Sequence, residues 1–264
     1  MNLIHVDDFN HPKLKIFQQL RDATFSKENA FIADSPKVVN LILETEIEVK
    51  SILATQEYYD EFKALIESKK IPELYVANKK LMQSIVGHKL HHNVMLHGIR
   101  PKTTPLNELG SNIIMLDNIT SSENVGSIAR SARALGVSSY LLPKHGPHPF
   151  GRRSLRVSMG HAAYLNISLY EEIKTTLQAL KALGYKIYAA EITKDAIPLS
   201  KVNIAEKWVL LVGHEGEGIS NEILELCSEV VYVEMEPSVK SLNVAVAASI
   251  LMYNFKRVHD LNTT

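Results

Sequence analysis

The stretch Trp208-Val209-Leu210-Leu211-Val212-Gly213-His214-Glu215-Gly216-Glu217-Gly218 decides the fold class of this chain. Its five apolar residues predict a buried strand, and the three glycines after them predict a tight loop that opens a helix over residues 219–227. Backbone N–H groups at such a helix start can bind a ligand. The glycine spacing is neither a dinucleotide fingerprint nor a P-loop, so this loop by itself could be only a glycine-rich turn.

Two other segments share this character, one earlier and one later in the chain. Asn124-Val125-Gly126-Ser127-Ile128-Ala129-Arg130 follows an apolar run at residues 113–116, and Ser241-Leu242-Asn243-Val244-Ala245-Val246-Ala247 opens a helical pattern at residues 244–257. Each joins an apolar run to a helix through small or polar residues, as ligand-binding loops of α/β proteins do. Ser241 and Asn243 alone could instead be helix N-caps. We expect the three loops to converge on one site.

Around these loops, apolar runs alternate with helical patterns from residue 112 onward. Strands are predicted at residues 113–116, 139–142, 163–168, 186–190, 208–212 and 230–233, and helices up to Leu135 and at residues 171–183, 219–227 and 244–257. Gly136 and Gly184 are the expected ends of the first two helices. The alternation predicts an α/β fold with a parallel sheet covered by helices on both faces. Residues 144–156 are expected to form a long polar connection.

The first hundred residues predict a smaller mixed α/β domain. Helical periodicity covers residues 12–25, 37–43, 56–68 and 79–86, and strand patterns cover residues 50–54, 73–77 and 93–98. Arg100-Pro101-Lys102-Thr103-Thr104-Pro105 then breaks the pattern with two prolines and no apolar periodicity. We therefore expect one domain at residues 1–100, a linker at residues 101–111 and a second domain at residues 112–264.

The charges are unevenly distributed, although they cancel over the 264 residues, with 29 basic and 29 acidic side chains. Residues 124–170 contain no Asp or Glu but six basic side chains, which are Arg130, Arg133, Lys144, Arg152, Arg153 and Arg156. This local positive charge predicts a surface for a polyanion such as RNA. The alternative is that acidic residues from elsewhere in the chain balance these cations in space.

Several classes of protein are disfavoured. The single cysteine, Cys227, excludes an intrachain disulfide. The chain shows neither a basic leader nor an apolar run of about 18 residues, so we expect a cytoplasmic protein. His88, His91, His92 and His97 cluster, but no Cys or carboxylate lies near them at metal-ligand spacing. We therefore expect no metal site, and no Gly-x-Ser-x-Gly elbow indicates a hydrolase.

Taken together, the three segments resemble the motifs of the SpoU (TrmH-like) RNA ribose 2′-O-methyltransferases of the SPOUT superfamily. The matching stretches are Asn124-x-Gly126-x-x-x-Arg130-x-Ala132 with Leu135-Gly136, then Leu211-Val212-Gly213-x-Glu215-Gly216-x-Gly218, then Val233-x-Met235 with Ser241-Leu242-Asn243-Val244-x-Val246-Ala247, and a fourth element, Arg156-x-Ser158-x-Gly160. The resemblance covers residues 112–258. The first hundred residues more weakly resemble the family's ribosomal-protein-like RNA-binding domain.

The resemblance implies a parallel-sheet SPOUT domain with a C-terminal trefoil knot, S-adenosyl-L-methionine as cofactor, and a homodimer whose active site uses both chains. It assigns catalysis to Arg130, Asn124, Glu215, Ser241 and Asn243. It assigns cofactor binding to Gly213, Gly218, Val233, Met235 and Leu242. The acid-free window adds Arg133, Arg152, Arg153 and Arg156 as RNA-binding candidates. Three sites depart from the family pattern, which are Ser121-Ser122 in place of Asp-Pro, Glu234 in place of Pro, and Pro237 in place of Gly.

The predicted reaction transfers a methyl group from a sulfonium to a ribose 2′-oxygen, so the substrate is expected to be RNA, which has that hydroxyl. Arg130 would act either as the base or by stabilising the developing alkoxide, with Asn243 and Glu215 orienting it or the cofactor. An N-terminal domain of this kind favours ribosomal RNA over tRNA. Two alternatives remain open: a catalytically impaired RNA-binding protein that keeps the fold, with Glu234 and Pro237 as its signature, and a metabolite-binding α/β enzyme that uses only the glycine loop.

Overall fold

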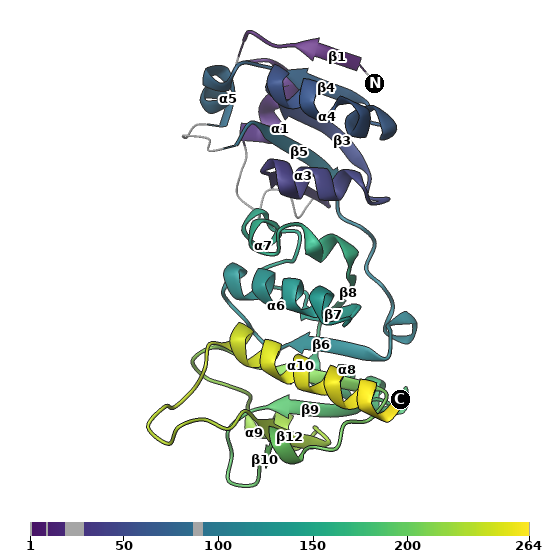
Figure 1. Cartoon of the computed structure of the whole chain (residues 1–264), viewed down its shortest axis with the longest axis vertical. Helices are drawn as coiled ribbons and strands as arrows, with labels where there is room; N and C mark the ends of the chain where they lie inside the picture. Colours follow the sequence, from purple (N-terminus) through teal and green to yellow (C-terminus); the bar gives the residue numbers. More distant parts are fainter. Residues whose placement is uncertain (1, 9, 19–28, 87–91, 264) are drawn as a thin grey trace. The chain divides into compact units, whose positions relative to one another are not determined.

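The computed structural model describes residues 2–8, 10–18, 29–86 and 92–263. The chain forms two compact units (Figure 1). The first consists of Met1–Lys102 and Pro149–Ala163, and the second of Thr103–His148 and Tyr164–Thr264. The sequence predicted a single boundary at residues 101–111, whereas the structure also assigns residues 149–163 to the first unit.

The core of the second unit is a parallel sheet, as predicted, and its seven described strands include a short one, Ile197–Pro198, that the sequence patterns did not predict. Its described strands lie in the order β10-β12-β9-β11-β6-β7-β8, and every pairing between them is parallel. They are β6 (Asn112–Leu116), β7 (Ser139–Pro143), β8 (Asn166–Tyr170), β9 (Lys186–Ala190), β10 (Ile197–Pro198), β11 (Trp208–Val212) and β12 (Glu229–Tyr232). The chain adds β7 and β8 on one side of β6, and β9, β11 and β12 on the other. The strand order therefore reverses between β6 and β11, where α/β proteins bind ligands.

Helices cover both faces of this sheet, as predicted. They are α6 (Ser122–Ala134), α8 (Ile173–Ala182), α9 (Asn221–Leu224) and α10 (Val244–Thr263). On one face, the Tyr140 hydroxyl of β7 donates to the Val125 carbonyl of α6 at 2.9 Å, and the Phe255 ring of α10 meets Trp208 of β11 edge-on at 5.1 Å. On the other face, α8 and α9 share one apolar core with β6, β7, β9 and β11. Burial of each large apolar side chain contributes about 1.5–3 kcal/mol to this packing.

Glycine ends two of these helices at the predicted positions. Gly136 follows α6 with φ +80°, and Gly184 follows α8 with φ +87°, a left-handed conformation that side chains disfavour. After α6, the Val137 N–H donates to the Ala132 carbonyl at 2.9 Å, and the same pattern follows α8. This hydrogen bond belongs to a Schellman motif, so the glycines determine where the helices stop.

The first unit contains a five-stranded mixed sheet in the order β1-β4-β3-β5-β2. Its strands are β1 (Asn2–His5), β2 (Ala30–Asp34), β3 (Val49–Ala54), β4 (Glu73–Val76) and β5 (Val94–Ile99). Its helices are α1 (Lys15–Gln18), α3 (Pro36–Leu43), α4 (Gln56–Ser68), α5 (Lys79–Val86) and α7 (Arg152–Val157). The predicted bounds of α3, α4, α5, β3, β4 and β5 are confirmed to within one residue. The sequence patterns did not predict β1 and β2.

Three predictions in the second half of the sequence were wrong in type or extent. Residues 144–156 are not one polar connection, because α7 begins at Arg152; with six residues, this helix is too short to show apolar periodicity. The strand predicted at residues 163–168 begins later, as β8, after the 3-10 helix η3 (His161–Tyr164). Of the helix predicted at residues 219–227, only α9 forms.

In the region of the helix predicted at residues 12–25, the 3-10 helix η1 (Pro12–Leu14) is followed by α1, and residues 19–25 lie outside the described residues. The remaining 3-10 helices are η2 (Leu106–Glu108) and η4 (Leu199–Lys201). Within the described part of the chain, none of the helices combines the length and apolar character needed to cross a membrane.

Candidate functional site

A cavity of about 680 Å³ opens at the carboxyl ends of β9, β11 and β12. It is lined by residues 190–193 at the end of β9, residues 212–219 at the end of β11, residues 231–233 and Met235 at the end of β12, and residues 241–244 at the start of α10. Eight of the predicted site residues lie on its wall, which are Gly213, Glu215, Gly218, Val233, Met235, Ser241, Leu242 and Asn243. The structure thus brings all five predicted cofactor-binding residues together, in a volume typical of small-molecule sites.

The glycine loop closes on itself beside this cavity. The Gly218 N–H donates to the His214 carbonyl at 3.0 Å, which joins the two ends of the loop. A Cβ on Gly213 would lie 2.5 Å from Ile219 and 2.7 Å from the Gly218 backbone. Gly218 has φ +69°, and a Cβ on it would overlap the Glu191 carboxylate. Only glycine fits at both positions without a shift of the loop.

Glu191 is a site residue that sequence reasoning missed. Its Oε2 accepts the Ile219 N–H at 2.9 Å, and its Oε1 accepts the Ile192 N–H at 3.0 Å. The carboxylate therefore ties the loop after β9 to the loop after β11. The one available signal was its position directly after the strand predicted at residues 186–190, because the carboxyl ends of neighbouring parallel strands share an edge.

Three of the predicted catalytic side chains form a hydrogen-bonded chain. Asn243 Nδ2 donates to Asn124 Oδ1 at 3.1 Å, and Asn124 Nδ2 donates to Glu215 Oε1 at 2.8 Å. The Thr120 and Ser121 N–H groups also donate to the Glu215 carboxylate, each at 3.3 Å. Burial raises the pKa of Glu215, but these hydrogen bonds outweigh burial and set the pKa below its usual value. Glu215 is therefore an anion that orients Asn124 and, through it, Asn243.

The starts of α6 and α10 position the two asparagines. Asn243 caps α10, because its Oδ1 accepts the N–H groups of Ala245 at 2.9 Å and Val246 at 3.3 Å. Farther along, the Ser249 hydroxyl donates to Ser131 Oγ of α6 at 2.7 Å. Together with the Asn243–Asn124 hydrogen bond at the helix starts, this contact shows that the two helices run side by side in the same direction. The N-cap interpretation of Asn243 is confirmed, and the same side chain also belongs to the polar chain.

Arg130, the expected catalytic arginine, lies on the exposed side of α6. The described residues that line the cavity do not include it. About one turn farther along, Arg133 is also exposed, and its guanidinium lies 5.0 Å from the centre of the Tyr164 ring. Within one chain, polar side chains from all three motifs meet, but the arginine of the first motif is outside the cavity wall.

Glu234, which departs from the family pattern, is held away from the cavity. Its Oε1 accepts the Ser200 N–H at 3.2 Å, and hydrogen bonding to Ser200 lowers the pKa of Glu234. Its neighbours Val233 and Met235 line the cavity, whereas Glu234 is not among the described residues of the wall. The substitution therefore anchors the loop after β12 to η4 without adding charge to the cavity wall.

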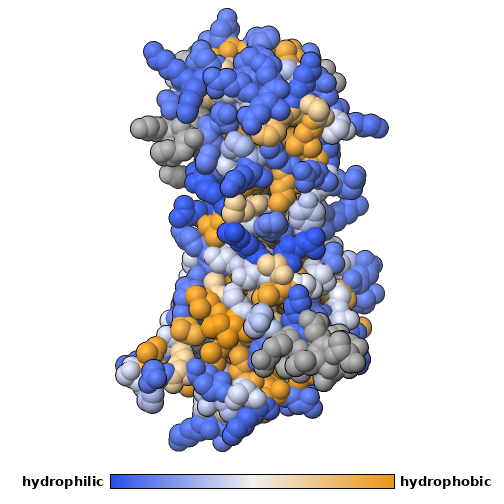
Figure 2. Space-filling model, in the orientation of Figure 1, coloured by the Kyte–Doolittle hydropathy of each residue, from blue (hydrophilic) through white to orange (hydrophobic). Residues whose placement is uncertain are grey.

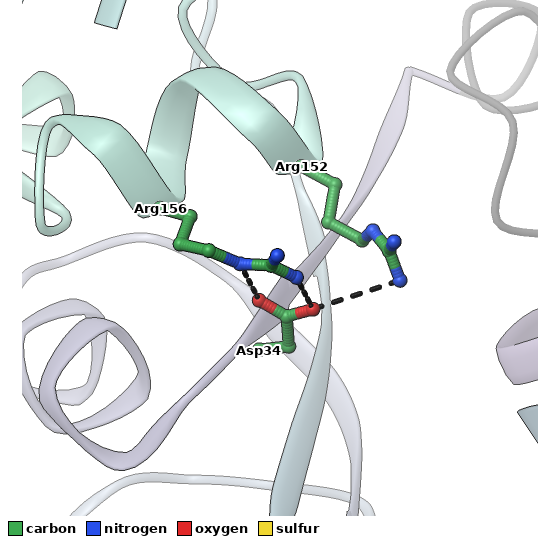
Figure 3. A network of polar contacts seen from close by, with 3 residues as sticks. All are labelled: Asp34, Arg152 and Arg156. Carbon is green, nitrogen blue, oxygen red and sulfur yellow. Dashed lines mark hydrogen bonds and ion pairs between the residues drawn. The ribbon is translucent and has the colours of Figure 1, made fainter. Parts of the chain in front are cut away.

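In the first unit, two of the predicted RNA-binding arginines pair with a buried carboxylate (Figure 3). Arg156 makes two hydrogen bonds to Asp34, one of them from Nε to Oδ1 at 3.0 Å, and Arg152 Nη1 lies 3.6 Å from Asp34 Oδ2. The Asp34 side chain, at the end of β2, is only 3% exposed. This cluster ties α7 to β2, although Arg156 and Asp34 are 122 positions apart in the sequence.

Acidic residues from outside the acid-free window thus balance at least three of its six cations. Asp34 pairs with Arg152 and Arg156, and Glu171 pairs with Lys144. The second interpretation of the charge pattern therefore holds for these three cations. RNA binding by Arg152, Arg153 and Arg156 stays a prediction.

Replacing Asp34 by asparagine is expected to lower the free energy of unfolding by about 2–4 kcal/mol, because two guanidinium groups would lose the carboxylate between them. Urea unfolding followed by circular dichroism measures this loss. The matched control is Glu48→Gln, which removes an exposed ion pair with Lys50 in the same unit and should cost less than about 1 kcal/mol. Equal losses for the two variants would contradict a stabilising role for the Asp34 cluster.

The histidine cluster near residue 90 is only partly described. His88 and His91 lie outside the described residues. Among the residues that the structure does describe, no three His, Cys, Asp or Glu side chains are placed to hold a metal ion.

Comparison with known sequences points to one family. A sequence model of the SpoU rRNA Methylase family matches residues 111–253, more than half of the chain. An uncharacterized tRNA/rRNA methyltransferase of Mycobacterium bovis is 28% identical over 232 residues, which are 86% of this chain and 80% of that protein. The 23S rRNA (guanosine(2553)-2′-O)-methyltransferase RlmP of Bacillus subtilis is 29% identical over 144 residues, which are 54% of this chain and 57% of that protein.

Two solved structures share the fold along nearly the whole chain. The AdoMet-bound rRNA methyltransferase from Sinorhizobium meliloti has a TM-score of 0.85 at 21% identity, over 97% of this chain and 98% of that chain. The SpoU methyltransferase AviRb from Streptomyces viridochromogenes, in complex with AdoMet, has a TM-score of 0.82 at 21% identity, over 95% of this chain and 100% of that chain. At these identities the likeness concerns the fold alone.

Proposed function

Because this chain belongs to the SpoU rRNA methylase family, we propose that it transfers the methyl group of S-adenosyl-L-methionine to a ribose 2′-hydroxyl of structured RNA, with ribosomal RNA favoured over tRNA. The observation that carries the proposal is the hydrogen-bonded chain Asn243–Asn124–Glu215, which joins all three motifs at the wall of one cavity. The name of the Bacillus subtilis relative supports the 2′-oxygen as acceptor.

The cavity has the chemistry that S-adenosyl-L-methionine needs. Its wall combines glycine backbone from the loop after β11 with the apolar side chains of Val233, Met235 and Leu242, which suit the adenosine part of the cofactor. At Gly213 and Gly218 the tight turn leaves no room for a side chain, so the loop presents bare backbone at these two positions. When bound, the cofactor supplies an activated methyl group. The protein therefore has to align the acceptor oxygen and stabilise its charge.

We place Arg130 at the cavity of a second copy of the chain. It lies outside the cavity wall of its own chain, and α10 carries an exposed apolar stripe of Val246, Ile250 and Tyr253, which are 47%, 37% and 59% exposed. Figure 2 shows apolar surface over the first half of α10. These three positions lie on one helix face, so a homodimer that buries this stripe is the proposed complete enzyme.

The proposed domain also has the C-terminal trefoil knot of the family. Two observations support it. The loops after β9, β11 and β12 meet at one cavity, and α10 packs along α6, so the C-terminal segment returns to the first helix of the unit.

In the proposed reaction, Arg130 stabilises the negative charge that develops on the 2′-oxygen. A guanidinium stays protonated in proteins, which makes it a poor base and a good charge stabiliser. The oxygen would gain the methyl group as the sulfur–methyl bond of the sulfonium breaks, which leaves a neutral thioether, and the proton of the hydroxyl would pass to water. Asn124 and Asn243 are fixed by Glu215 and by the start of α10 before RNA binds, so their amide groups need no reorganisation during the reaction.

The proposed RNA surface includes the side of α6 that carries Arg130 and Arg133. Arg133 and the exposed Tyr164 place a positive charge beside an aromatic ring, and unpaired RNA bases stack on such rings. The first unit is proposed as a second RNA-binding element, with Arg153 exposed on α7.

Replacing Tyr164 by alanine is expected to weaken RNA binding about tenfold, since base stacking on an aromatic ring contributes about 1–3 kcal/mol. Filter binding with a 23S rRNA transcript at fixed salt measures the Kd. Tyr164→Phe keeps the ring and should bind within about twofold of wild type. Loss of affinity in both variants, or in neither, would show that the ring does not stack on RNA.

The direct test of the proposed function is a map of 2′-O-methylated nucleotides in total RNA, from cells with and without this protein. One or more ribosomal sites should lose the modification when the protein is absent and regain it when the purified protein and S-adenosyl-L-methionine are added. Unchanged maps for both ribosomal RNA and tRNA would refute the proposal.

The alternative of a catalytically impaired RNA-binding protein depended on Glu234 and Pro237. Because the Glu234 carboxylate binds the Ser200 N–H and lies outside the described cavity wall, it gives no reason for cofactor binding to fail. Calorimetric titration with S-adenosyl-L-methionine separates the two functions, since a protein that only binds RNA would release no heat.

A further inference from the structure

His214 lies on the cavity wall and holds the glycine loop with both its side chain and its backbone. Its Nδ1 accepts the N–H groups of Gly216 and Glu217, each at 3.1 Å, and its carbonyl accepts the Gly218 N–H at 3.0 Å. One residue thus binds three consecutive N–H groups of the loop. The reaction proposed above assigns His214 no task.

The two side-chain hydrogen bonds require a neutral imidazole. Nδ1 must present a lone pair to both N–H groups, so the proton of the neutral ring is on Nε2. In the imidazolium form both ring nitrogens are donors, and an Nδ1–H would point at two other N–H groups. Protonation of His214 therefore removes both hydrogen bonds and replaces them with donor–donor repulsion.

We propose that His214 is a positioning residue for the cofactor: its neutral imidazole holds the glycine loop in the form that binds S-adenosyl-L-methionine, and its protonation weakens that binding. The inference rests on the proposed function only in placing the cofactor in this cavity. It requires neither RNA nor a second chain.

The direction of the pH dependence follows from which form binds. The neutral imidazole holds the loop in the form that binds the cofactor. The affinity for S-adenosyl-L-methionine is therefore highest above the pH range in which histidine usually gains its proton, and it falls as the pH is lowered. The apparent Kd rises as the neutral fraction falls. We expect a loss of about tenfold between about pH 8 and about pH 5.5.

Among the described residues, the charged groups that line the cavity with His214 or interact with it electrostatically are acidic. They are Asp117 at the end of β6, Glu215 and Glu217 in the loop itself, and Glu191 after β9, with Tyr170 of β8 beside Asp117. Burial raises the pKa of Asp117, and its interaction with His214 opposes that rise. Nδ1 itself is held by the Gly216 and Glu217 N–H groups, so the loop depends on an acceptor nitrogen that protonation removes.

The test is calorimetric titration of the full chain with S-adenosyl-L-methionine between about pH 8 and about pH 5.5. The wild type should bind about tenfold more weakly at the lower pH. His214→Asn should bind within about threefold of wild type at about pH 8 and show no such loss, because its side-chain oxygen accepts the same N–H groups in an Asx turn and does not titrate. His214→Ala should bind about tenfold more weakly at about pH 8, since it offers no acceptor.

The control for other titrating groups is His145→Asn. His145 is exposed and is not among the described residues of the cavity wall, so this variant should keep the wild-type pH dependence. A second readout is the ¹⁵N NMR spectrum of the bound protein, which should show the Nε2–H tautomer of His214.

Three results would overturn the inference: a wild-type pH slope in His214→Asn, wild-type affinity in His214→Ala at about pH 8, or an Nδ1–H tautomer in the bound state. None of them affects the proposed function. A wild-type protein that binds no cofactor at any pH would instead refute the proposed function, and this inference with it.

Discussion

Replacing Arg130 by alanine is expected to lower the rate of RNA methylation by about a thousandfold, while the Kd for S-adenosyl-L-methionine stays within about twofold of wild type. The rate falls because the proposed alkoxide loses its cationic partner. Cofactor affinity is kept because Arg130 is not among the described residues that line the cavity. Single-turnover methylation of a 23S rRNA transcript measures the rate, and calorimetry measures the affinity.

Arg133→Ala is the matched control, since Arg133 is also exposed on α6, about one turn away. It should raise the KM for RNA several-fold and leave the single-turnover rate at saturating RNA nearly unchanged. A methylation rate near wild type in Arg130→Ala would refute the catalytic role of this arginine.

Mixing two inactive variants tests whether Arg130 serves the cavity of its own chain or that of a second chain. In a mixed dimer of Arg130→Ala and Asn243→Ala, one cavity keeps its own Asn243 and can receive Arg130 from the other chain. The proposed arrangement therefore predicts that activity returns on mixing, up to about a quarter of the wild-type rate if the chains exchange at random. An arginine that acts within its own chain predicts no recovery.

Replacing Gly213 by alanine is expected to weaken S-adenosyl-L-methionine binding by at least about a hundredfold. The new Cβ would lie 2.5 Å from Ile219 and 2.7 Å from the Gly218 backbone, and a backbone neighbour can make room only if the loop moves. Because this loop forms part of the cavity wall, its movement removes cofactor contacts. Calorimetry measures the affinity, and thermal unfolding shows whether the variant is still folded.

Gly216→Ala is the control in the same loop. A Cβ at this position would meet only the His214 ring, at 3.7 Å, which is an ordinary contact. This variant should bind the cofactor within about threefold of wild type. Similar losses in Gly213→Ala and Gly216→Ala would mean that the loop responds to any side chain, and that the close contact at Gly213 is not the cause.

Much of the second unit could be predicted because its signals are local. Residues 208–212 and 113–116 are continuous apolar runs, and Gly136 and Gly184 provide the left-handed residue at a helix end. The short helix α7 gave no such signal. Its six residues are held by Asp34 and by burial of Leu155, and neither contact is visible from the helix's own sequence.

The sequence predicted most of the residues of the site but not how their side chains are placed and bonded. The glycine loop and the Asn243 segment line one cavity, as expected from the edge where parallel strands end. Glu191 and His214 were missed, because a carboxylate or an imidazole that binds loop N–H groups has no characteristic spacing in sequence. The position of Arg130 outside the described cavity wall was not predicted either, because residue type says nothing about which side of a helix faces the ligand.

By itself, the sequence determined the parallel α/β fold, most element boundaries and the membership of three motifs in one family. These depend on periodicity and glycine chemistry, which act over a few neighbouring residues. Only the tertiary structure decided that Asn243 donates to Asn124 across 119 positions, and that Asp34 neutralises two arginines of the acid-free window. Such pairs form because the sheets bring distant loops to one edge. Sequence patterns that extend over a few residues cannot predict contacts between residues so far apart in the chain.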